Sequence, residues 1–264
     1  MIKVANLTRR FRNFTAVDSV SFEVHPGEIF GFLGPNGAGK STIVMMLTTL
    51  LKPSSGWAEI CGYNVVKESS KVRENISVVF QDHTSDEWLT GREYLLLHAG
   101  IYNASEARIE DLLRIFNLNG WKDTVIKQYS SGMRRRLEIA RGLIHYPQVL
   151  FLDEPTLGLD LQTRMKIWSY IESLNKEEDV TIFLTTHYME EADKLCDRIA
   201  IIDYGKIVAI GTSEELKSVL GSNVKKPTLD DVFIHYTKEE IRDGVSNDEI
   251  HSFRRFRRGG FFRC

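Results

Sequence analysis

Residues 28–51 read EIFGFLGPNGAGKSTIVMMLTTLL, and this stretch decides the fold. Its apolar beginning, residues 29–33, is typical of a short buried strand. A glycine-rich turn follows, and an apolar run long enough for a buried helix comes next. Because Gly34, Gly37 and Gly39 lack a Cβ atom, successive backbone N–H groups of this turn can point inward around an anion. The stretch therefore predicts a strand, an anion-binding loop and a helix.

The turn also matches G-x-x-x-x-G-K-[ST], the P-loop pattern, in the strand–loop–helix setting that the pattern requires. The helix begins at Lys40 and Ser41, where the positive end of its dipole faces the loop. The Lys40 ammonium suits the β- and γ-phosphates, and the Ser41 hydroxyl suits Mg²⁺. The alternative is a glycine turn that happens to precede a helix. The sequence predicts a site for a nucleoside triphosphate.

Composition limits the class of protein. A chain of 264 residues suits one large or two small domains, and its net charge of −2 gives no reason to expect a nucleic-acid partner. The cysteines, Cys61, Cys196 and Cys264, are odd in number and far apart, which fits a reducing cytoplasm. The N-terminus lacks an apolar signal core, and no run reaches the roughly 18 apolar residues of a membrane span. A membrane role would therefore require another chain.

The regions around the P-loop predict further strands. Residues 2–24 alternate loosely between apolar and polar, which predicts two edge strands that end at a His25-Pro26-Gly27 turn. Phe11 lies between them, where it could either pack in the core or stack on an adenine ring. Residues 57–61 and 76–80 predict two more strands. Gln81 follows the second, as a ligand-facing group of an open α/β sheet or as a solvated loop residue.

From residue 89 to 144 the periodicity is helical, with helices predicted at 92–101 and at 105–116, the latter capped by Ser105. A third helix follows residues 129–131, with an apolar face and arginines on its other faces. Ser130 and Ser131 can cap this helix, whose N-terminus is a second anion-binding end. The alternative is a surface helix with a solvated basic face.

Chemistry-bearing side chains follow two later strands. Asp153 and Glu154 end the apolar run 149–152, where two carboxylates would be costly without a function. Asp153 is predicted to position Mg²⁺ and Glu154 to polarise an attacking water. His187 follows the strand predicted at 180–185 and can reach a γ-phosphate. Asp160 lies in the loop before a helix predicted at 161–174.

The C-terminal part predicts a hairpin at residues 199–210 and a short helix at 227–236 that packs Leu229, Val232 and Phe233. The tail SFRRFRRGGFFRC (252–264) is either a disordered basic end or a contact for anionic lipid, RNA or a partner.

Together these motifs resemble the nucleotide-binding subunit of ATP-binding-cassette (ABC) proteins over residues 1–220. VLFLDE (149–154) is similar to the Walker B motif with its catalytic Glu154, Gln81 to the Q-loop, LGLD (157–160) to the D-loop and His187 to the switch histidine. YSSGM (129–133), with Ser130, Ser131 and Gly132, occupies the place of the signature LSGGQ, and Phe11 that of the adenine-stacking aromatic. YSSGMRRRLEIARGL and PTLDDVF resemble the daunorubicin-type drug exporters and related ABC-2 systems. The Walker A residues implied to bind ATP are Gly34, Pro35, Asn36, Gly37, Ala38, Gly39, Lys40, Ser41 and Thr42.

The resemblance implies a P-loop NTPase (RecA-like) α/β fold: a mainly parallel sheet, an N-terminal antiparallel β subdomain and an inserted helical subdomain. The ATP-binding core would comprise residues 1–88 and 145–220, the helical subdomain 89–144, and a C-terminal extension 221–264 with a partly disordered basic tail. ATP and Mg²⁺ are the implied ligands, with Ser41, Gln81 and Asp153 around the metal and Glu154, His187 and Gln81 in catalysis. The signature would serve the ATP of a facing second subunit, and Asp160 would be a further ATP-binding residue.

The implied activity is ATP hydrolysis that drives an integral membrane permease, on the cytoplasmic face of the cell membrane, with no specific nucleic acid. One departure is Ser131, where the family signature has a glycine. A serine would strain the site if this residue needs a positive φ, and it would be harmless as a first-turn helical residue.

Two other functions stay open. A non-transport ABC ATPase would act in translation, repair or cluster assembly, but this chain has neither tandem cassettes nor long coiled coils. A P-loop GTPase or kinase is the third possibility. A GTPase would want Asn-Lys-x-Asp, and residues 175–178 (NKEE) lack its final aspartate.

Overall fold

Two β-sheets organise the computed structural model, which describes residues 1–81, 85–221 and 226–237. The larger sheet has the order β10-β9-β3-β8-β7-β6. Its strands are β3 (Ile29–Leu33), β6 (Ile76–Val79), β7 (Val149–Asp153), β8 (Thr181–Thr186), β9 (Arg198–Asp203) and β10 (Lys206–Gly211). All neighbours pair in parallel except β9 and β10, which form the predicted hairpin. The mainly parallel α/β sheet expected from the sequence is confirmed.

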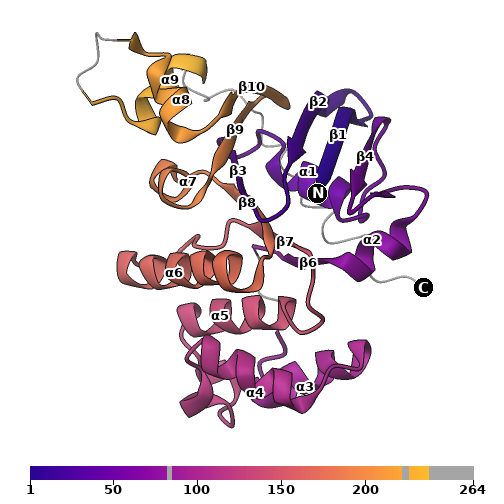
Figure 1. Cartoon of the computed structure of the whole chain (residues 1–264), viewed down its shortest axis with the longest axis vertical. Coiled ribbons are helices and arrows are strands. Elements are labelled where there is room, and N and C mark those ends of the chain that lie inside the picture. The colour runs from indigo at the N-terminus through magenta and orange to yellow at the C-terminus, as the bar shows by residue number, and fades with distance from the viewer. Residues whose placement is uncertain (82–84, 222–225, 238–264) are drawn as a thin grey trace.

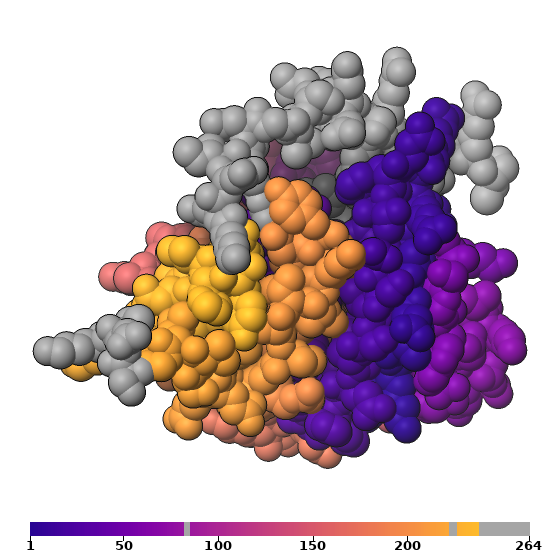
Figure 2. All heavy atoms as spheres, turned by 90° about the horizontal axis from the view of Figure 1, so that it is seen from above, coloured from indigo at the N-terminus to yellow at the C-terminus, as the bar shows by residue number. Residues whose placement is uncertain are grey.

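The smaller sheet is antiparallel and has the order β2-β1-β4-β5. It consists of β1 (Ile2–Phe11), β2 (Phe14–Val24), β4 (Ser55–Ile60) and β5 (Tyr63–Asn64). The prediction of two edge strands is wrong for β1, which pairs with β2 on one side and β4 on the other. β4 comes from beyond the P-loop helix, so this pairing is not visible in the local pattern. β2 also lies beside the β9–β10 hairpin, where Asp18 N–H donates to Gly205 O over 2.8 Å (Figure 2).

Helices cover both faces of the larger sheet. They are α1 (Lys40–Leu47), α2 (Ser69–Asn75), α3 (Gly91–Tyr102), α4 (Glu106–Ile115), α5 (Ser131–Gly142), α6 (Leu161–Glu178), α7 (Met189–Leu195), α8 (Ser213–Ser218) and α9 (Leu229–Thr237), with short 3-10 turns at Asn119–Trp121 and Ile126–Gln128. Figure 1 shows α6, α5 and the α3–α4 pair stacked in succession away from the sheet. No helix in the described ranges is both long and apolar enough to cross a lipid bilayer.

The two faces of the sheet bury different residues because side chains alternate along each strand. Phe151 and Phe183 share a core with α1, whereas Leu150, Leu152 and Leu184 share a core with α5 and α6. The first core contains an aromatic group in which the Phe183 ring lies 5.3 Å from Phe151 and 5.6 Å from Phe32. α1 and α5 therefore lie on opposite faces of the sheet.

Local signals placed several helices correctly. α3 and α4 match the predicted 92–101 and 105–116, and the Ser105 side chain accepts a hydrogen bond from Arg108 N–H as the N-cap. α9 buries Leu229, Val232 and Phe233 as predicted. Residues 238–264, with the Arg/Phe-rich tail, lie outside the described residues.

The expectation for the arginines of α5 needs correction. The sequence places them on faces away from the core, yet Arg135 is only 3% exposed. α5 is enclosed between the α3–α4 pair, α6 and the end of β6, so little of its surface meets water. The structure also decides the position of Ser131. It is the first residue of α5, after the N-cap Ser130, and it is not among the residues with positive φ, so serine is tolerated there without strain.

Phe183→Ala is expected to lower the free energy of unfolding by about 3–5 kcal/mol, because it leaves a cavity among closely packed aromatic rings. Urea denaturation followed by circular dichroism measures this loss. Phe14→Ala is the matched control, since Phe14 is 54% exposed, and its effect should stay within about 0.5 kcal/mol. Equal losses for both variants would contradict the packing described here.

Gly132→Ala is expected to destabilise the chain by about 1–3 kcal/mol. A Cβ at Gly132 would lie 2.4 Å from Thr163 Cγ2, and that methyl group cannot turn away because the Thr163 hydroxyl donates to Asp160 over 2.6 Å. The double variant Gly132→Ala/Thr163→Ser removes the methyl group, keeps the hydroxyl and should recover the loss in the same denaturation assay. A double variant as unstable as Gly132→Ala alone would show that this contact is not the cause.

Candidate functional site

The P-loop joins β3 to α1 at the edge of the sheet where the parallel strands end. Gly37 and Gly39 have φ values of +82° and +107°, which side chains other than glycine rarely adopt. A Cβ at Gly34 would lie 2.5 Å from Ile202 O, so close packing also requires that glycine. Ala38 and Thr42 are buried, while Asn36 and Gly37 are exposed at the mouth of the loop. The loop thus has the backbone shape that the sequence predicts.

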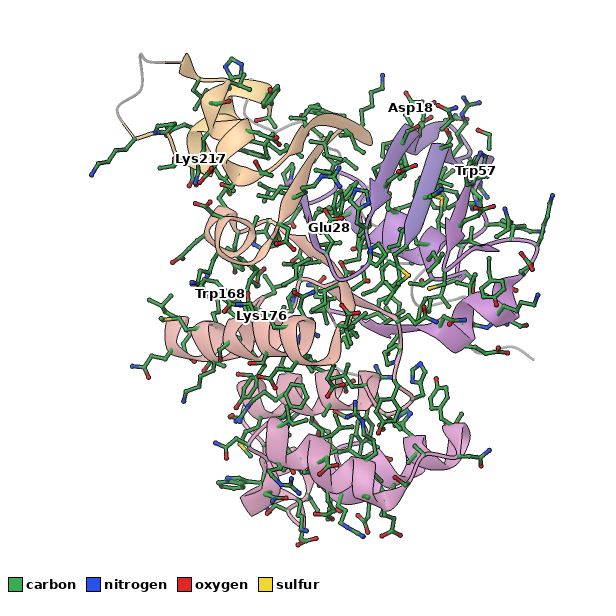
Figure 3. All side chains as sticks on the ribbon, viewed as in Figure 1. Asp18, Glu28, Trp57, Trp168, Lys176 and Lys217 are labelled. Carbon is green, nitrogen blue, oxygen red and sulfur yellow. The ribbon has the colours of Figure 1, made fainter. Side chains whose placement is uncertain are left out.

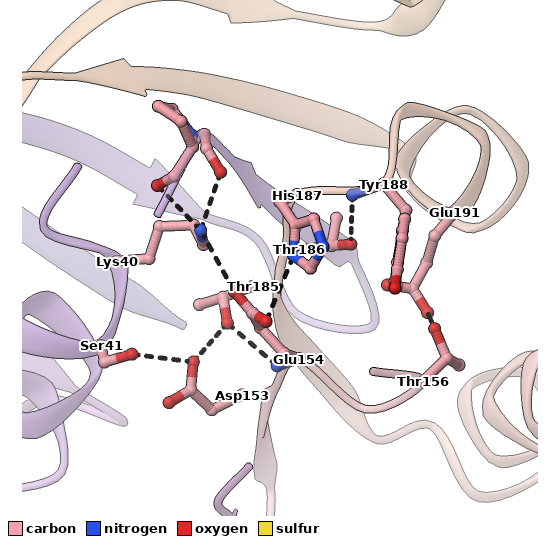
Figure 4. Close-up of polar contacts among 12 residues, drawn as sticks. Lys40, Ser41, Asp153, Glu154, Thr156, Thr185, Thr186, His187, Tyr188 and Glu191 are labelled. Carbon is pink, nitrogen blue, oxygen red and sulfur yellow. Dashed lines mark hydrogen bonds and ion pairs between the residues drawn. The ribbon is translucent and has the colours of Figure 1, made fainter. Parts of the chain in front are cut away.

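The Lys40 ammonium lies at the centre of the site (Figure 4). It donates to Gly34 O over 2.7 Å and to Pro35 O over 3.1 Å, and it lies 3.2 Å from Glu154 Oε1. Lys40 is buried, and a buried ammonium needs such oxygen partners because it has lost its hydration. The loop and the carboxylate after β7 are therefore joined through one cation.

The two carboxylates at the end of β7, Asp153 within the strand and Glu154 just after it, have different partners. Asp153 Oδ1 accepts hydrogen bonds from the hydroxyls of Thr185, over 2.5 Å, and Ser41, over 3.3 Å. The backbone of Glu154 has a left-handed conformation, with φ +49°, and its N–H donates to Thr185 O over 3.0 Å. Its Oε2 lies 3.2 Å from His187 Nδ1. The structure thus brings together the predicted Lys40, Ser41, Asp153, Glu154 and His187.

Other predicted residues lie apart from this cluster. Ser130 caps α5 by accepting a hydrogen bond from Met133 N–H over 3.2 Å, and both Ser130 and Ser131 are exposed. Asp160 is exposed and caps α6, and the hydrogen bonds from Thr163 lower the pKa of its carboxyl. Among the described residues, no hydrogen bond or ion pair joins these side chains or Gly132 to the Lys40 cluster.

Phe11 and Gln81 come from elements other than those that carry the Lys40 cluster. Phe11 is at the end of β1, where the Arg9 guanidinium stacks 4.5 Å from the centre of its ring. Gln81 is partly exposed and comes two residues after the last residue of β6, next to residues outside the described ranges. In the described residues it forms no hydrogen bond with Asp153 or Glu154. The structure leaves the adenine-stacking and metal roles of these two residues as predictions.

Sequence reasoning missed three polar groups around the site. The first is Thr185, whose hydroxyl donates a hydrogen bond to the Asp153 carboxylate. Glu191 of α7 is fully buried and accepts hydrogen bonds from the Thr156 hydroxyl over 2.7 Å and from the indole N–H of Trp168 over 2.9 Å. Figure 3 shows Trp168 between α6 and α7. Burial raises the pKa of Glu191, although these hydrogen bonds partly offset it. The third is Arg135. For Thr185, the hydroxyl after the apolar run of β8 was the available signal. α5 and α7 contain several charged residues each, so no local signal distinguishes Arg135 or Glu191.

The near match to a guanine-binding motif has a structural explanation. The Asn175 side-chain amide donates to Gly27 O over 2.7 Å and to Val180 O over 3.1 Å, so it fixes the end of α6 against the chain around β3 and β8. These bonds account for the asparagine without a base-binding role.

The comparisons with known proteins agree with this geometry. A family model described as ABC transporter matches residues 17–157. The daunorubicin/doxorubicin resistance ATP-binding protein DrrA of Streptomyces peucetius is 44% identical over 254 residues, covering 95% of this chain and 77% of that protein. A structure described as the ATP binding subunit of an ABC transporter aligns with a TM-score of 0.78 and 28% identity, covering 90% of this chain and 99% of that chain.

A dimeric structure of the ATP-binding cassette MJ0796 in a post-hydrolysis state, bound to ADP and Pi, aligns with a TM-score of 0.71 and 27% identity, covering 80% of this chain and 98% of that chain. The family model spans more than half of the chain, and the Streptomyces relative spans nearly all of it. The chain therefore belongs to the ABC transporter family, as an ATP-binding subunit with ATPase activity.

Proposed function

We propose that the cluster around Lys40 binds Mg²⁺-ATP and hydrolyses it as one half of a two-subunit site. The observation that carries this proposal is the placement of the Lys40 ammonium between the P-loop carbonyls and Glu154, 3.2 Å from the carboxylate. Residues 34–42 would surround the phosphates with backbone N–H groups, and Lys40 would supply the positive charge. The γ-phosphate would then compete with Glu154 for Lys40.

The residues present fit Mg²⁺, which prefers oxygen ligands. The Ser41 hydroxyl and Asp153 Oδ1 are 3.3 Å apart and face the same space at the end of the loop. Ser41, Asp153 and Gln81 would hold the ion, directly or through its waters, with Gln81 moving toward the pair from the end of β6. When bound, Mg²⁺ would neutralise charge on the phosphate oxygens.

Glu154 is proposed as the general base and His187 as its neighbour at the γ-phosphate. Both Glu154 oxygens have a nitrogen close by: Oε1 lies 3.2 Å from Lys40 Nζ, and Oε2 lies 3.2 Å from His187 Nδ1. If the γ-phosphate binds Lys40 and the His187 ring, the Glu154 carboxylate loses both neighbours and can orient a water and accept its proton. The Thr185 hydroxyl bonds the carboxylate of Asp153, whereas the Thr185 carbonyl bonds only the backbone N–H of Glu154. Thr185 therefore leaves the Glu154 carboxylate available to act as the base.

The signature residues are proposed to serve the ATP of a second nucleotide-binding subunit, identical or different. Three observations support this: Ser130, Ser131 and Asp160 are exposed, α5 and α1 lie on opposite faces of the sheet, and no described contact links the signature to Lys40. The α5 N-terminus would add a second set of N–H groups to the partner's triphosphate. Phe11, in the antiparallel sheet beside the P-loop, would stack on the adenine.

The partner that would use this energy is proposed to be an integral membrane permease of the ABC-2 exporter type, with this chain on the cytoplasmic face of the membrane. The names of the relatives, which describe resistance to daunorubicin and doxorubicin, support a drug-like cargo. Leu97 and Ile101, four residues apart on α3, are 60% and 67% exposed, which supports the helical block 89–144 as the docking region. Residues 1–88 and 145–220 would form the catalytic core and 221–264 an extension, with no specific nucleic-acid partner.

Glu154→Gln is expected to keep or tighten ATP binding and to slow phosphate release by about 10²–10⁴-fold, because the carboxamide cannot accept a proton and no longer neutralises Lys40. ATP should then convert the variant to a stable dimer in light scattering. Lys40→Ala should lose ATP binding. The control Glu190→Gln, on the exposed face of α7, should hydrolyse ATP like the wild type. Normal phosphate release by Glu154→Gln would refute the proposed base.

A tagged chain purified from solubilised membranes is expected to bring with it a polytopic membrane protein. Leu97→Glu with Ile101→Glu should abolish that co-purification, because two charges replace the exposed apolar pair, while ATP binding to the P-loop on the other face stays intact. Mass spectrometry identifies the partner. Co-purification of ribosomes or DNA in place of a membrane protein would instead favour a non-transport ATPase.

A further inference from the structure

Arg135 of α5 binds three backbone carbonyls through one buried guanidinium. Nε donates to Pro155 O over 2.8 Å, Nη1 to Phe80 O over 2.6 Å and Nη2 to Asp153 O over 3.1 Å. Two of these carbonyls belong to the residues on either side of Glu154, and the third belongs to the residue before Gln81. One side chain of the signature helix therefore holds the flanks of the proposed base and the strand end that leads to Gln81.

We propose that Arg135 is a positioning residue for ATP hydrolysis, which fixes Glu154 relative to the signature helix and to the start of the Gln81 loop. The inference rests on the proposed function of Glu154 as general base. Arg135 itself would touch neither nucleotide nor water. It would act through the peptides that it holds.

The backbone at Glu154 needs such support. Its φ of +49° is a left-handed conformation that costs free energy for any residue with a Cβ, and such residues persist only where their surroundings hold them firmly. The Glu154 N–H is held by Thr185 O. The carbonyls before and after Glu154 are held by Arg135. Without the two bonds from Arg135, the described backbone bonds left to Glu154 are those of its own N–H to Thr185 and of its own carbonyl to Leu157 N–H. The peptides on either side of it would lose their fixed orientation, and the carboxylate could shift relative to Lys40 and His187.

The stability of the fold alone does not call for an arginine here. Arg135 is 3% exposed, and within the described residues no salt bridge joins it to a carboxylate. Burial lowers its pKa to about 10, while the nearby charges of Glu138, Asp153 and Glu191 raise it, so it stays a cation at neutral pH. Burying a cation is costly, and well-packed apolar residues often stabilise a core as well or better. We therefore explain the presence of Arg135 by the three carbonyls that it binds, which gives it a positioning function.

The side-chain type matches that geometry. A guanidinium is planar and carries five N–H donors in fixed directions, so it can bind three separate acceptors at once. A lysine at the same place keeps the charge but offers a single nitrogen. The neighbouring Arg136 also binds carbonyls, those of Gly132, Phe116 and Asn117, but all three acceptors lie in the helical block and none flanks Glu154. Arg136 therefore serves as a natural control on the same helix.

The position of Arg135 also links the signature, where the partner subunit's ATP would bind, to the strand end before Gln81. α5 begins at Ser131, one turn before Arg135, where the partner subunit's ATP would bind. Phe80 O lies just before Gln81, on the side of the sheet that leads toward the helical block. A shift of α5 would move the two peptides at Glu154 and the peptide at Phe80 together. Arg135 thus couples the engagement of the signature to the position of the base.

The test compares Arg135→Lys and Arg135→Met with Arg136→Lys in the full-length chain. Phosphate release at saturating Mg²⁺-ATP gives kcat, and titration with a fluorescent ATP analogue gives the Kd. We expect Arg135→Lys to lower kcat by about 10- to 100-fold, the scale of misplaced catalytic groups. The Kd should stay within about two-fold of the wild type, because Arg135 contacts neither Lys40 nor the P-loop. Arg136→Lys should change neither value by more than about two-fold.

Arg135→Met separates positioning from folding. It removes the buried charge with a side chain of similar length, so the variant should fold, and the thermal unfolding midpoint checks this. A folded Arg135→Met with wild-type Kd and lowered kcat supports the proposal. Wild-type kcat in either Arg135 variant, or a Kd that weakens in step with kcat, overturns it.

Glu154→Gln, measured in the same assay, distinguishes the two levels of inference. If Glu154→Gln is inactive while Arg135→Lys is fully active, the base stands and the positioning role fails. If Glu154→Gln hydrolyses ATP normally, the proposed base fails, and the role of Arg135 fails with it.

Discussion

The buried ammonium of Lys40 is the interaction on which the site depends. It must be matched by oxygen atoms, and these come from the P-loop carbonyls and from Glu154. Because β3, β7 and β8 are neighbouring parallel strands, their ends meet at one edge and bring loop, carboxylates and histidine to the same cation. A ligand that competes for Lys40 would change the partners of Glu154 at the same time. In the proposed mechanism, phosphate binding and the state of Glu154 as the base would therefore be linked by a single contact.

The alternation of side chains along the strands explains why one chain holds only half of the proposed site. Leu150 and Leu152 face the core of the helical block, and Phe151 faces α1. The P-loop helix and the signature helix are consequently kept on opposite faces of the sheet. Arg135 is the described side chain of α5 that reaches the peptides flanking Glu154. Through these hydrogen bonds, the helical block directly contacts the turn that carries the proposed base, Glu154.

Much of the fold could be predicted where the signal is local. The buried strand before the P-loop, the Ser105 cap and the turn between β9 and β10 each depend on a few adjacent residues, and all three are confirmed. The edge position expected for β1 was wrong, because its second partner, β4, lies some fifty residues further along the chain. The arginines of α5 were expected on faces away from the core for a similar reason. Helical spacing shows which residues share a face but not what covers that face.

By itself, the sequence determined the P-loop and the two carboxylates at the end of β7, because their chemistry depends on residue type and short spacing. Only the tertiary structure decided that Glu154 stands between Lys40 and His187, that Ser131 opens a helix without strain, and that Arg135 is buried. The reason is physical. Burial and partner choice arise when segments distant in the chain pack together, and no local pattern records which carbonyl will meet a guanidinium.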